Sequence, residues 1–147
     1  MSEQSLPSIL VVDDNQDNTE IVRQYLETKG YPVTAAHDGD EALAVFETLR
    51  PAIVLLDVMM PGRDGWEVCR IMKQHPELGR AVRVVMVTAL DDLEDKREAL
   101  QSGADDYLEK PFDLPQLLAA VQRNLAVLRR PADPRADAGA SAQIAPA

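Results

Sequence analysis

The sequence predicts a single α/β domain built around a parallel sheet of five strands. Short runs rich in Val and Ile alternate along the chain with segments of helical periodicity, and this alternation is typical of βα units. The runs Ile9–Val12 and Ile53–Leu56 are apolar at every position, as expected for strands that helices cover on both faces. The chain has 147 residues, which is enough for one domain with a core and too few for two ordinary domains.

We expect each strand to be followed by a helix. The first helix, Asp17–Lys29, carries an apolar stripe and stops at Gly30, and the second, Asp40–Leu49, ends before Pro51. The third begins at the N-cap residue Asp64 and closes before His75-Pro76, the fourth runs from Asp91 or Asp92 to Ser102-Gly103, and the last spans Pro115–Leu128. The strands are expected at Ile9–Val12, Val33–Ala36, Ile53–Leu56, Val82–Val87 and Asp106–Leu108.

The domain is expected to span residues 8–130, between two tails. Residues 1–7 form a short N-terminal tail. Residues 131–147 consist mostly of Ala, Pro and small polar residues without a periodic apolar face, so we interpret them as a disordered tail or a truncated linker.

Composition and charge exclude several classes of function. A net charge of −10 without a basic stripe argues against direct binding of nucleic acid. No apolar run approaches the length of a membrane span, and the N-terminus lacks the regions of a signal peptide. Cys69 is the single cysteine, so no internal disulfide can form. We therefore expect a cytoplasmic protein with no membrane association.

Polar side chains follow the expected strands at the edge of the sheet where α/β proteins bind ligands. Asp13 and Asp14 follow the first strand, Asp57 the third, Thr88 the fourth and Lys110 the fifth. Three clustered carboxylates repel one another unless a cation joins them, and oxygen ligands with open positions favour Mg²⁺, for which Mn²⁺ could substitute. A lysine beside such a site suits a phosphoryl oxygen. The pattern therefore indicates phosphoryl transfer.

The residues around these positions resemble the receiver domains of two-component response regulators. The likeness covers about residues 8–128 and depends on several motifs in a fixed order. The motifs are Ile9-Leu10-Val11-Val12-Asp13-Asp14-Asn15, Leu55-Leu56-Asp57-Val58-Met59-Met60-Pro61-Gly62-Arg63-Asp64-Gly65, Val87-Thr88-Ala89, and Gly103-Ala104-Asp105-Asp106-Tyr107-Leu108-Glu109-Lys110-Pro111-Phe112.

The resemblance implies a fold and a set of site residues. The fold would be flavodoxin-like, a (βα)5 three-layer sandwich with strand order 2-1-3-4-5. Asp57 would accept a phosphoryl group from a histidine kinase or phosphotransfer protein. Asp14, Asp57 and the backbone carbonyl of Met59 would bind Mg²⁺ directly, and Asp13 would act through a bound water.

The same resemblance implies a switch next to the acceptor. Lys110 and the hydroxyl of Thr88 would hold phosphoryl oxygens, and the Lys110-Pro111 bond would be cis. Movement of Thr88 toward the phosphoryl group would free space for the ring of Tyr107. The surface of the fourth helix, fifth strand and last helix would then change for a downstream protein partner.

Two departures from the family pattern modify these expectations. Met59 and Leu90 stand where many receivers carry polar residues that guide a hydrolytic water, which predicts slow self-dephosphorylation. Gln116 and Ala120 replace a Glu and an Arg that form dimer ion pairs in the winged-helix DNA-binding branch. We therefore expect a monomer or weak dimer, and no turnover enzyme.

Three other interpretations are compatible with parts of the sequence. An α/β phosphatase with an Asp nucleophile usually has two acidic residues separated by one position after the first strand, whereas Asp13 and Asp14 are adjacent. A receiver-like binding module that needs no phosphate would have no use for the complete set of site residues. A receiver detached from a larger hybrid kinase or regulator agrees with the composition of residues 131–147.

Overall fold

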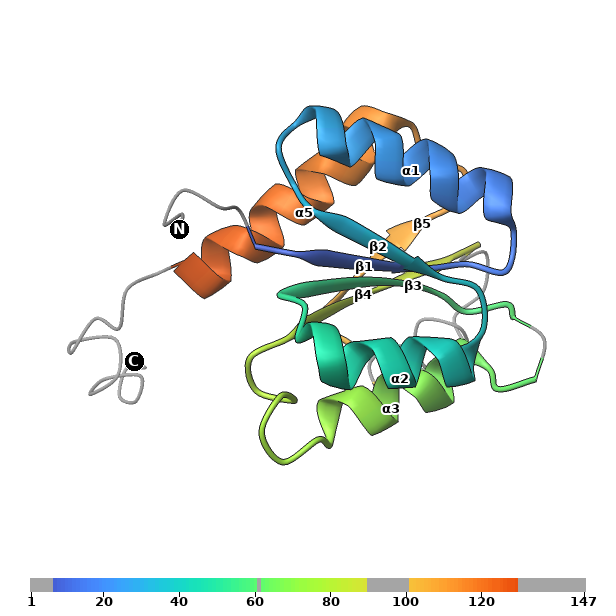
Figure 1. Ribbon diagram of the computed structural model, residues 1–147, viewed down its shortest axis with the longest axis vertical. Helices are drawn as coiled ribbons and strands as arrows, with labels where there is room; N and C mark the ends of the chain where they lie inside the picture. Colours follow the sequence, from blue (N-terminus) through green and yellow to red (C-terminus); the bar gives the residue numbers. More distant parts are fainter. Residues whose placement is uncertain (1–6, 61, 90–100, 130–147) are drawn as a thin grey trace.

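The computed structural model describes residues 7–60, 62–89 and 101–129 and contains a central five-stranded parallel sheet between two layers of helices (Figure 1). The strand order is β2-β1-β3-β4-β5, so the predicted flavodoxin-like α/β fold is confirmed. The strands are β1 (Ile9–Val12), β2 (Val33–Ala36), β3 (Ile53–Asp57), β4 (Arg83–Thr88) and β5 (Asp106–Glu109).

β3 and β4 each extend one residue beyond the predicted apolar run, because Asp57 and Thr88 also take part in strand pairing. Asp57 pairs with Val87, and Thr88 pairs with Glu109. The apolar runs predicted β1 and β2 correctly, but they placed Asp57 and Thr88 just after their strands. Both residues lie inside the ladder, because backbone hydrogen bonds hold a polar residue in a strand as well as an apolar one. Their side chains are thereby fixed by the sheet and not by a loop.

Local capping interactions set where the helices begin. The helix α1 (Gln16–Thr28) begins at Asn15, whose side chain accepts a hydrogen bond from the backbone N–H of Asn18. Asp38 and Asp64 cap α2 (Gly39–Leu49) and α3 (Gly65–Lys73) in the same way, so the predicted cap at Asp64 is confirmed.

The last helix, α5 (Leu114–Arg129), begins with a capping box. The backbone N–H of Gln116 donates to Asp113 at 2.8 Å, and the side chain of Gln116 accepts from the backbone N–H of Asp113 at 2.8 Å. Gln116, which the sequence marked only as a missing dimer contact, therefore stabilises the start of α5.

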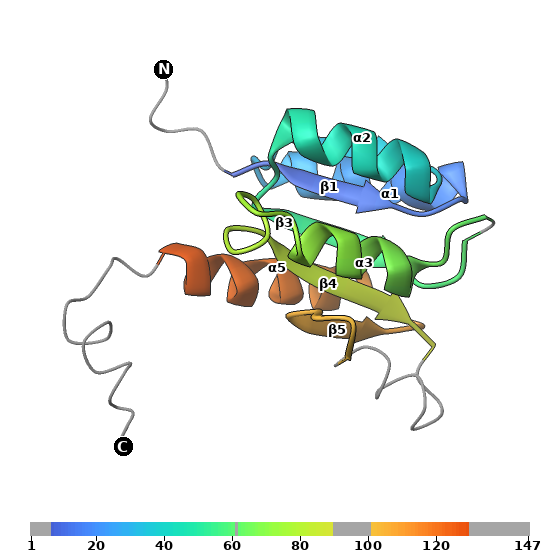
Figure 2. The same ribbon diagram turned by 90° about the horizontal axis from the view of Figure 1, so that it is seen from below.

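The sheet divides the core into two apolar clusters, one on each face. Leu10 and Val54 belong to the cluster that includes residues of α2 and α3, whereas their neighbours Ile9 and Ile53 belong to the cluster that includes residues of α1 and α5. Figure 2 shows α2 and α3 on one face of the sheet and α1 and α5 on the other. Alternation along a strand sends successive side chains to opposite faces, so burial on both faces requires a fully apolar strand. Trp66, Cys69 and Met72 of α3 all lie in the first cluster, as their helical spacing predicted.

Several predictions fall outside the described residues. They are the greater part of the fourth helix, the position of Leu90, and most of the two tails, residues 1–6 and 130–147. Within the described part of the chain, no helix is long and apolar enough to cross a membrane.

Candidate functional site

Three carboxylates meet at the edge of the sheet where β1 and β3 end. One carboxylate oxygen from each of Asp13, Asp14 and Asp57 lies within 4.8 Å of the others. β1 and β3 are neighbours in the parallel sheet, so the residues at their carboxyl ends are necessarily close. Asp57 is only 4% exposed, whereas Asp13 is half-buried and Asp14 is exposed. The cluster therefore extends from the protein interior to solvent.

Burial controls the electrostatics of Asp57. Loss of water raises the pKa of the Asp57 carboxyl, and the nearby charge of Asp13 acts in the same direction. The ammonium of Lys110 and the backbone N–H of Met59 oppose this by stabilising the carboxylate, but the pKa stays above its ordinary value. Asp57 is thus a carboxylate whose negative charge is incompletely compensated by the protein.

Lys110 reaches Asp57 from the end of β5. Its Nζ lies 3.1 Å from Oδ1 of Asp57, and its backbone N–H donates to the carbonyl of Thr88 at 2.8 Å. The Lys110-Pro111 peptide bond is cis, as expected. Thr88 is the last residue of β4 and is 3% exposed. The structure therefore brings a buried hydroxyl residue and an ammonium to the ends of β4 and β5, on the same side of Asp57.

The residues after Asp57 fold back over it. The backbone N–H of Met59 donates to Oδ1 of Asp57 at 3.2 Å, and the Met59 side chain is 76% exposed. The backbone N–H of Gly65 donates to the carbonyl of Val58 at 3.1 Å. A side chain at position 65 would place its Cβ 2.3 Å from the carbonyl oxygen of Asp57, so this approach requires glycine.

Two asparagines that sequence reasoning did not assign to the site orient Asp13. The backbone N–H of Asn15 donates to Oδ1 of Asp13 at 2.9 Å, and the side-chain amide of Asn18 lies 3.4 Å from Oδ2. A signal was available, because Asn is a favoured helix N-cap residue and Asn15 follows the acidic pair directly. The sequence placed Gly65 in a motif but did not predict that its backbone lies close to the carbonyl of Asp57.

The cluster has the ligand chemistry of a site for a hard divalent cation. Carboxylate oxygens are its only side-chain donors, and neither His nor Cys belongs to it among the described residues. Such a donor set fits Mg²⁺ or Mn²⁺ better than Zn²⁺. The raised pKa of Asp57 also favours a cation site, because Lys110 compensates the negative charge of Asp57 only in part and a bound cation would compensate the remainder. The residues present therefore fit the metal that the sequence predicts.

A groove of about 940 Å³ opens beside the carboxylates, between α1 and the segment that joins β5 to α5. Asp13 and Lys110 lie on its polar side, and Ile21, Phe112 and Leu114 contribute apolar surface. Ile21 is 54% exposed, so its apolar side chain is available for contact at the groove. The groove thus combines access to the Asp57 region with an apolar contact area.

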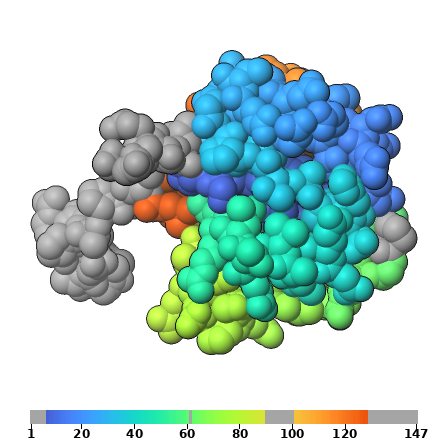
Figure 3. Space-filling view, viewed as in Figure 1, coloured from blue at the N-terminus to red at the C-terminus, as the bar shows by residue number. Residues whose placement is uncertain are grey.

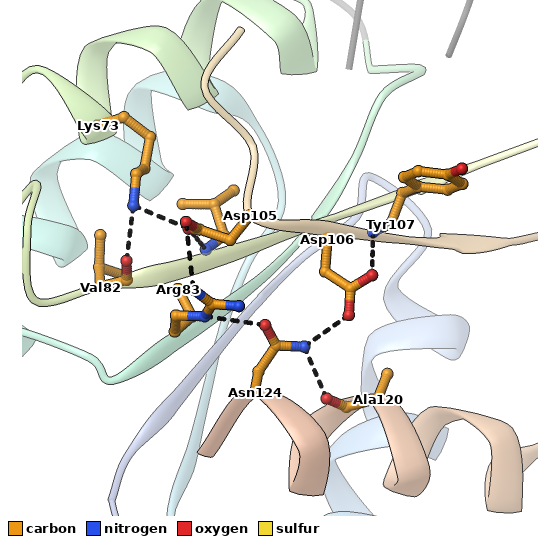
Figure 4. A network of polar contacts seen from close by, with 9 residues as sticks. Lys73, Val82, Arg83, Asp105, Asp106, Tyr107, Ala120 and Asn124 are labelled. Carbon is orange, nitrogen blue, oxygen red and sulfur yellow. Dashed lines mark hydrogen bonds and ion pairs between the residues drawn. The ribbon is translucent and has the colours of Figure 1, made fainter. Parts of the chain in front are cut away.

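Tyr107 lies in β5, half-buried, and packs against the apolar cluster on the α2 and α3 face. Its backbone N–H donates to the side chain of Asp106 at 2.8 Å, while its ring lies apart from the polar side chains nearby (Figure 4). Among the described residues, the ring therefore packs against apolar side chains, whereas polar contacts hold the backbone of β5.

The start of β5 is held by a polar network that joins both faces of the sheet (Figure 4). Asp105 accepts hydrogen bonds from Lys73 of α3 and from the backbone of Val84, both at 2.8 Å. The buried Asn124 of α5 accepts from Arg83 at 3.0 Å and donates to Asp106 at 2.8 Å. This network fixes the backbone beside Tyr107.

Asp106 carries the charge on the α5 side of this network. Partial burial acts to raise its pKa, but hydrogen bonds from Arg123 at 2.7 Å and from Asn124 prevail, so the pKa lies below its ordinary value. Asp106 is therefore ionised and paired within its own chain.

Comparison with known proteins gives matches along most of the chain. The family described as "Response regulator receiver domain" matches residues 9–122. The chemotaxis response regulator CheY4 of Vibrio cholerae is 32% identical, with a TM-score of 0.76 over 81% of this chain and 98% of that one.

Two further solved structures show the same likeness. The signal receiver domain of a signal transduction histidine kinase from Syntrophus aciditrophicus is 34% identical, with a TM-score of 0.79 over 85% of this chain and 94% of that one. A CheY-like response regulator receiver domain protein from Methanospirillum hungatei is 31% identical, with a TM-score of 0.79 over 86% and 98% of the two chains.

Proposed function

The chain belongs to the family of response regulator receiver domains, and from this premise we propose that Asp57 is its phosphoacceptor. Receiver domains are phosphorylation-type signalling switches of two-component systems, and they generally take their phosphoryl group from histidine kinases or phosphotransfer proteins. The observation that carries the proposal is the meeting of Asp13, Asp14 and Asp57 within 4.8 Å, with Lys110 at 3.1 Å from Asp57.

In the proposed reaction a carboxylate oxygen of Asp57 attacks the phosphorus of a phosphohistidine. A new O–P bond forms, the N–P bond breaks, and the histidine nitrogen keeps the electron pair of the broken bond. Receivers generally bind Mg²⁺ at their acidic pocket; here Asp14, Asp57 and the Met59 carbonyl would hold it directly and Asp13 through water. The bound ion would neutralise negative charge on the carboxylates and the phosphoryl oxygens.

Lys110 has two roles in this proposal. Before transfer its ammonium contacts Oδ1 of Asp57, where it favours the carboxylate form that attacks. During transfer it moves to a phosphoryl oxygen and stabilises the charge that develops there. The Thr88 hydroxyl would hold a second oxygen, which its place at the end of β4 next to β3 supports.

We propose that the apolar groove receives the phosphodonor. The groove opens beside Asp13 and Lys110, so a partner seated there would bring its phosphohistidine to the acidic cluster. Ile21 and Phe112 would supply apolar contacts from α1 and from the start of the β5–α5 connection. The phosphodonor would be a histidine kinase or a phosphotransfer protein.

The output proposal concerns Thr88 and Tyr107. Capture of a phosphoryl oxygen by Thr88 would draw its side chain toward Asp57 and free space on the side of Tyr107. The packing of the half-buried Tyr107 ring against the apolar cluster supports such a movement, because apolar contacts are not directional. The altered surface around β5 and α5 would bind a downstream protein.

We further propose that the protein phosphorylates and slowly dephosphorylates itself but is no turnover enzyme. Slow loss of the phosphoryl group is expected from the apolar side chain of Met59 beside Asp57. A monomer or weak dimer is expected because Gln116 is engaged in capping α5 and Ala120 has no charge to offer a partner. The cytoplasmic location inferred from the sequence belongs to the same proposal, and cell fractionation would test it.

A receiver that forms part of a larger kinase or regulator is the second candidate. It is favoured by the likeness to the receiver domain of the Syntrophus aciditrophicus histidine kinase, which is 34% identical. The chemistry at Asp57 would be the same in both cases, and only the downstream target would differ.

The proposal is tested by incubating the protein with acetyl phosphate and Mg²⁺ and measuring its intact mass. We expect a gain of one phosphoryl group, which chelation of the metal prevents and which Asp57→Ala abolishes. Asp17→Ala, which removes an exposed carboxylate from α1, is the matched control and should be phosphorylated as the wild type is. A wild-type protein that gains no mass while a known receiver does would contradict the proposal.

A further inference from the structure

We propose that Arg63 is a positioning residue for metal binding, because it fastens the segment Met59–Asp64 to the helices beside it. This segment follows Asp57 and carries the backbone carbonyl of Met59, which is a proposed ligand of Mg²⁺. The inference rests on the proposed function, since it concerns the same metal site. The segment lies at the edge of the molecule, beside the start of α2 (Figure 3).

The guanidinium of Arg63 joins two helices. Its Nε donates to Oδ1 of Asp40 at 2.6 Å, and its NH1 donates to Oε2 of Glu67 at 2.9 Å. Asp40 lies in the first turn of α2 and Glu67 in the first turn of α3. Arginine suits this arrangement because its planar fork directs donors toward two carboxylates at once.

The stem of Arg63 also has a fitted place on α2. A Cβ added to Gly39 would lie 2.8 Å from Cβ and 3.3 Å from Cδ of Arg63. Glycine at position 39 therefore leaves the space that the arginine stem occupies. Contact along the stem and ion pairs at its tip together restrict where residue 63 can lie.

The other described contacts of the segment lie mainly at its two ends. The backbone N–H of Met59 donates to Asp57, Met60 packs against the core, and Asp64 caps α3, while the hydrogen bond from Gly65 to Val58 closes the base. The Met59 side chain is 76% exposed, and among the described residues outside its chain neighbours none has an atom within 4 Å of a Cβ placed on Gly62. If a loop becomes ordered only when its carbonyl binds a metal, the loss of conformational entropy weakens metal binding. Contacts that order the loop beforehand reduce this cost and strengthen binding.

A positioning role and a purely electrostatic role of Arg63 predict opposite changes in Mg²⁺ affinity when the side chain is removed. If Arg63 acted only as a positive charge near an acidic site, its loss would strengthen the binding of Mg²⁺. If it holds the Met59 carbonyl in place, its loss weakens binding even though the site becomes more negative. Arg63→Lys separates the two effects further, because lysine keeps the charge and loses the fork between Asp40 and Glu67.

The chain offers a matched control in Arg23. This arginine also bridges two carboxylates, Glu20 and Glu27, with NH1 at 2.9 Å from Oε1 of Glu27. All three residues belong to α1, so the bridge ties no loop to the site. Arg23→Ala and Arg23→Lys therefore remove the same chemistry without the proposed positioning.

The experiment is the dissociation constant of Mg²⁺, measured by titration calorimetry on the 147-residue chain without any phosphodonor. We expect Arg63→Ala to weaken binding about threefold, the size of effect that an exposed ion pair can produce. Arg63→Lys should weaken it at least as much, because it loses the fork and gains no compensating negative charge at the site, and neither Arg23 variant should weaken it. Equal or tighter binding by Arg63→Ala, or equal weakening by Arg23→Ala, would overturn the inference. A wild type that binds no Mg²⁺ would instead contradict the proposed function itself, and the inference with it.

Discussion

Replacement of Asp13 by Asn should stabilise the metal-free protein, because the three site carboxylates repel one another. At 4.8 Å, the upper limit of their oxygen separations, two unit charges interact by about 3.5 kcal/mol at an effective dielectric constant near 20. Water reaches the half-buried Asp13, so we expect Asp13→Asn to raise the free energy of unfolding by only about 1–2 kcal/mol at neutral pH. The asparagine retains an oxygen for the backbone N–H of Asn15.

The gain should depend on pH in a defined direction. The pKa of Asp57 is raised above its ordinary value of 3.8, so the folded state holds this proton more tightly than the unfolded state. The contribution of Asp57 to the free energy of unfolding is therefore fully present below pH 3.8 and is lost as the pH rises through the folded pKa of Asp57. The advantage of Asp13→Asn should accordingly shrink in acid, where Asp57 is protonated and repulsion ceases.

Magnesium should reverse the order of stability. A ligand that binds only the folded state raises the free energy of unfolding, and the wild type has more negative charge with which to bind it. Urea denaturation with and without Mg²⁺, followed by circular dichroism, measures both effects. Asp17→Asn removes an exposed carboxylate in the first turn of α1; it is the control and should have little effect on the free energy of unfolding. An Asp13→Asn protein no more stable than the wild type in chelator would refute the repulsion argument.

Three further predictions concern other parts of the molecule. Asn124→Ala should lower the free energy of unfolding by about 2–4 kcal/mol, since it breaks hydrogen bonds to Arg83 and Asp106; urea denaturation measures this, and a loss within error of zero would count against the network. Ile21→Glu should slow phosphotransfer from a phosphohistidine protein about tenfold, equivalent to roughly 1.4 kcal/mol, and leave acetyl phosphate labelling unchanged. Val127→Glu, at a side chain that is 49% exposed on α5, is its control, and equal slowing by both variants would exclude the groove. Met59→Asn should shorten the lifetime of the phosphorylated protein several-fold, as followed by the decay of phosphoprotein after removal of the donor, and an unchanged decay rate would remove Met59 as the cause of slow hydrolysis.

Local patterns in the sequence were sufficient to predict most of the fold. β1 and β2 have the predicted bounds, because each is a short, largely apolar segment followed by polar residues. β3 and β4 extend one residue further, to Asp57 and Thr88, because strand pairing does not distinguish polar from apolar residues. The capping box at the start of α5 was not predicted, although its spacing from Asp113 to Gln116 is a recognisable signal.

The candidate site was predictable in part because its residues follow strands of a parallel sheet. Topology alone then places Asp13 and Asp57 together and brings Lys110 to the same edge. Contacts between residues on separate elements had no comparable signal. The ion pair between Arg63 and Asp40 depends on how helices pack, as do the hydrogen bonds that join Asn124 of α5 to Arg83 and Asp106. No periodicity or motif in the sequence predicts that packing.

The most direct test of the central claim is the chemical identification of the phosphorylated residue. Borohydride reduces an aspartyl phosphate to homoserine, so the protein is labelled with acetyl phosphate and Mg²⁺, reduced, digested and sequenced by mass spectrometry. We predict homoserine at position 57 and at no other aspartate. Homoserine at position 13 or 14, or a phosphate that resists borohydride because it is attached to a hydroxyl or a histidine, would contradict the account.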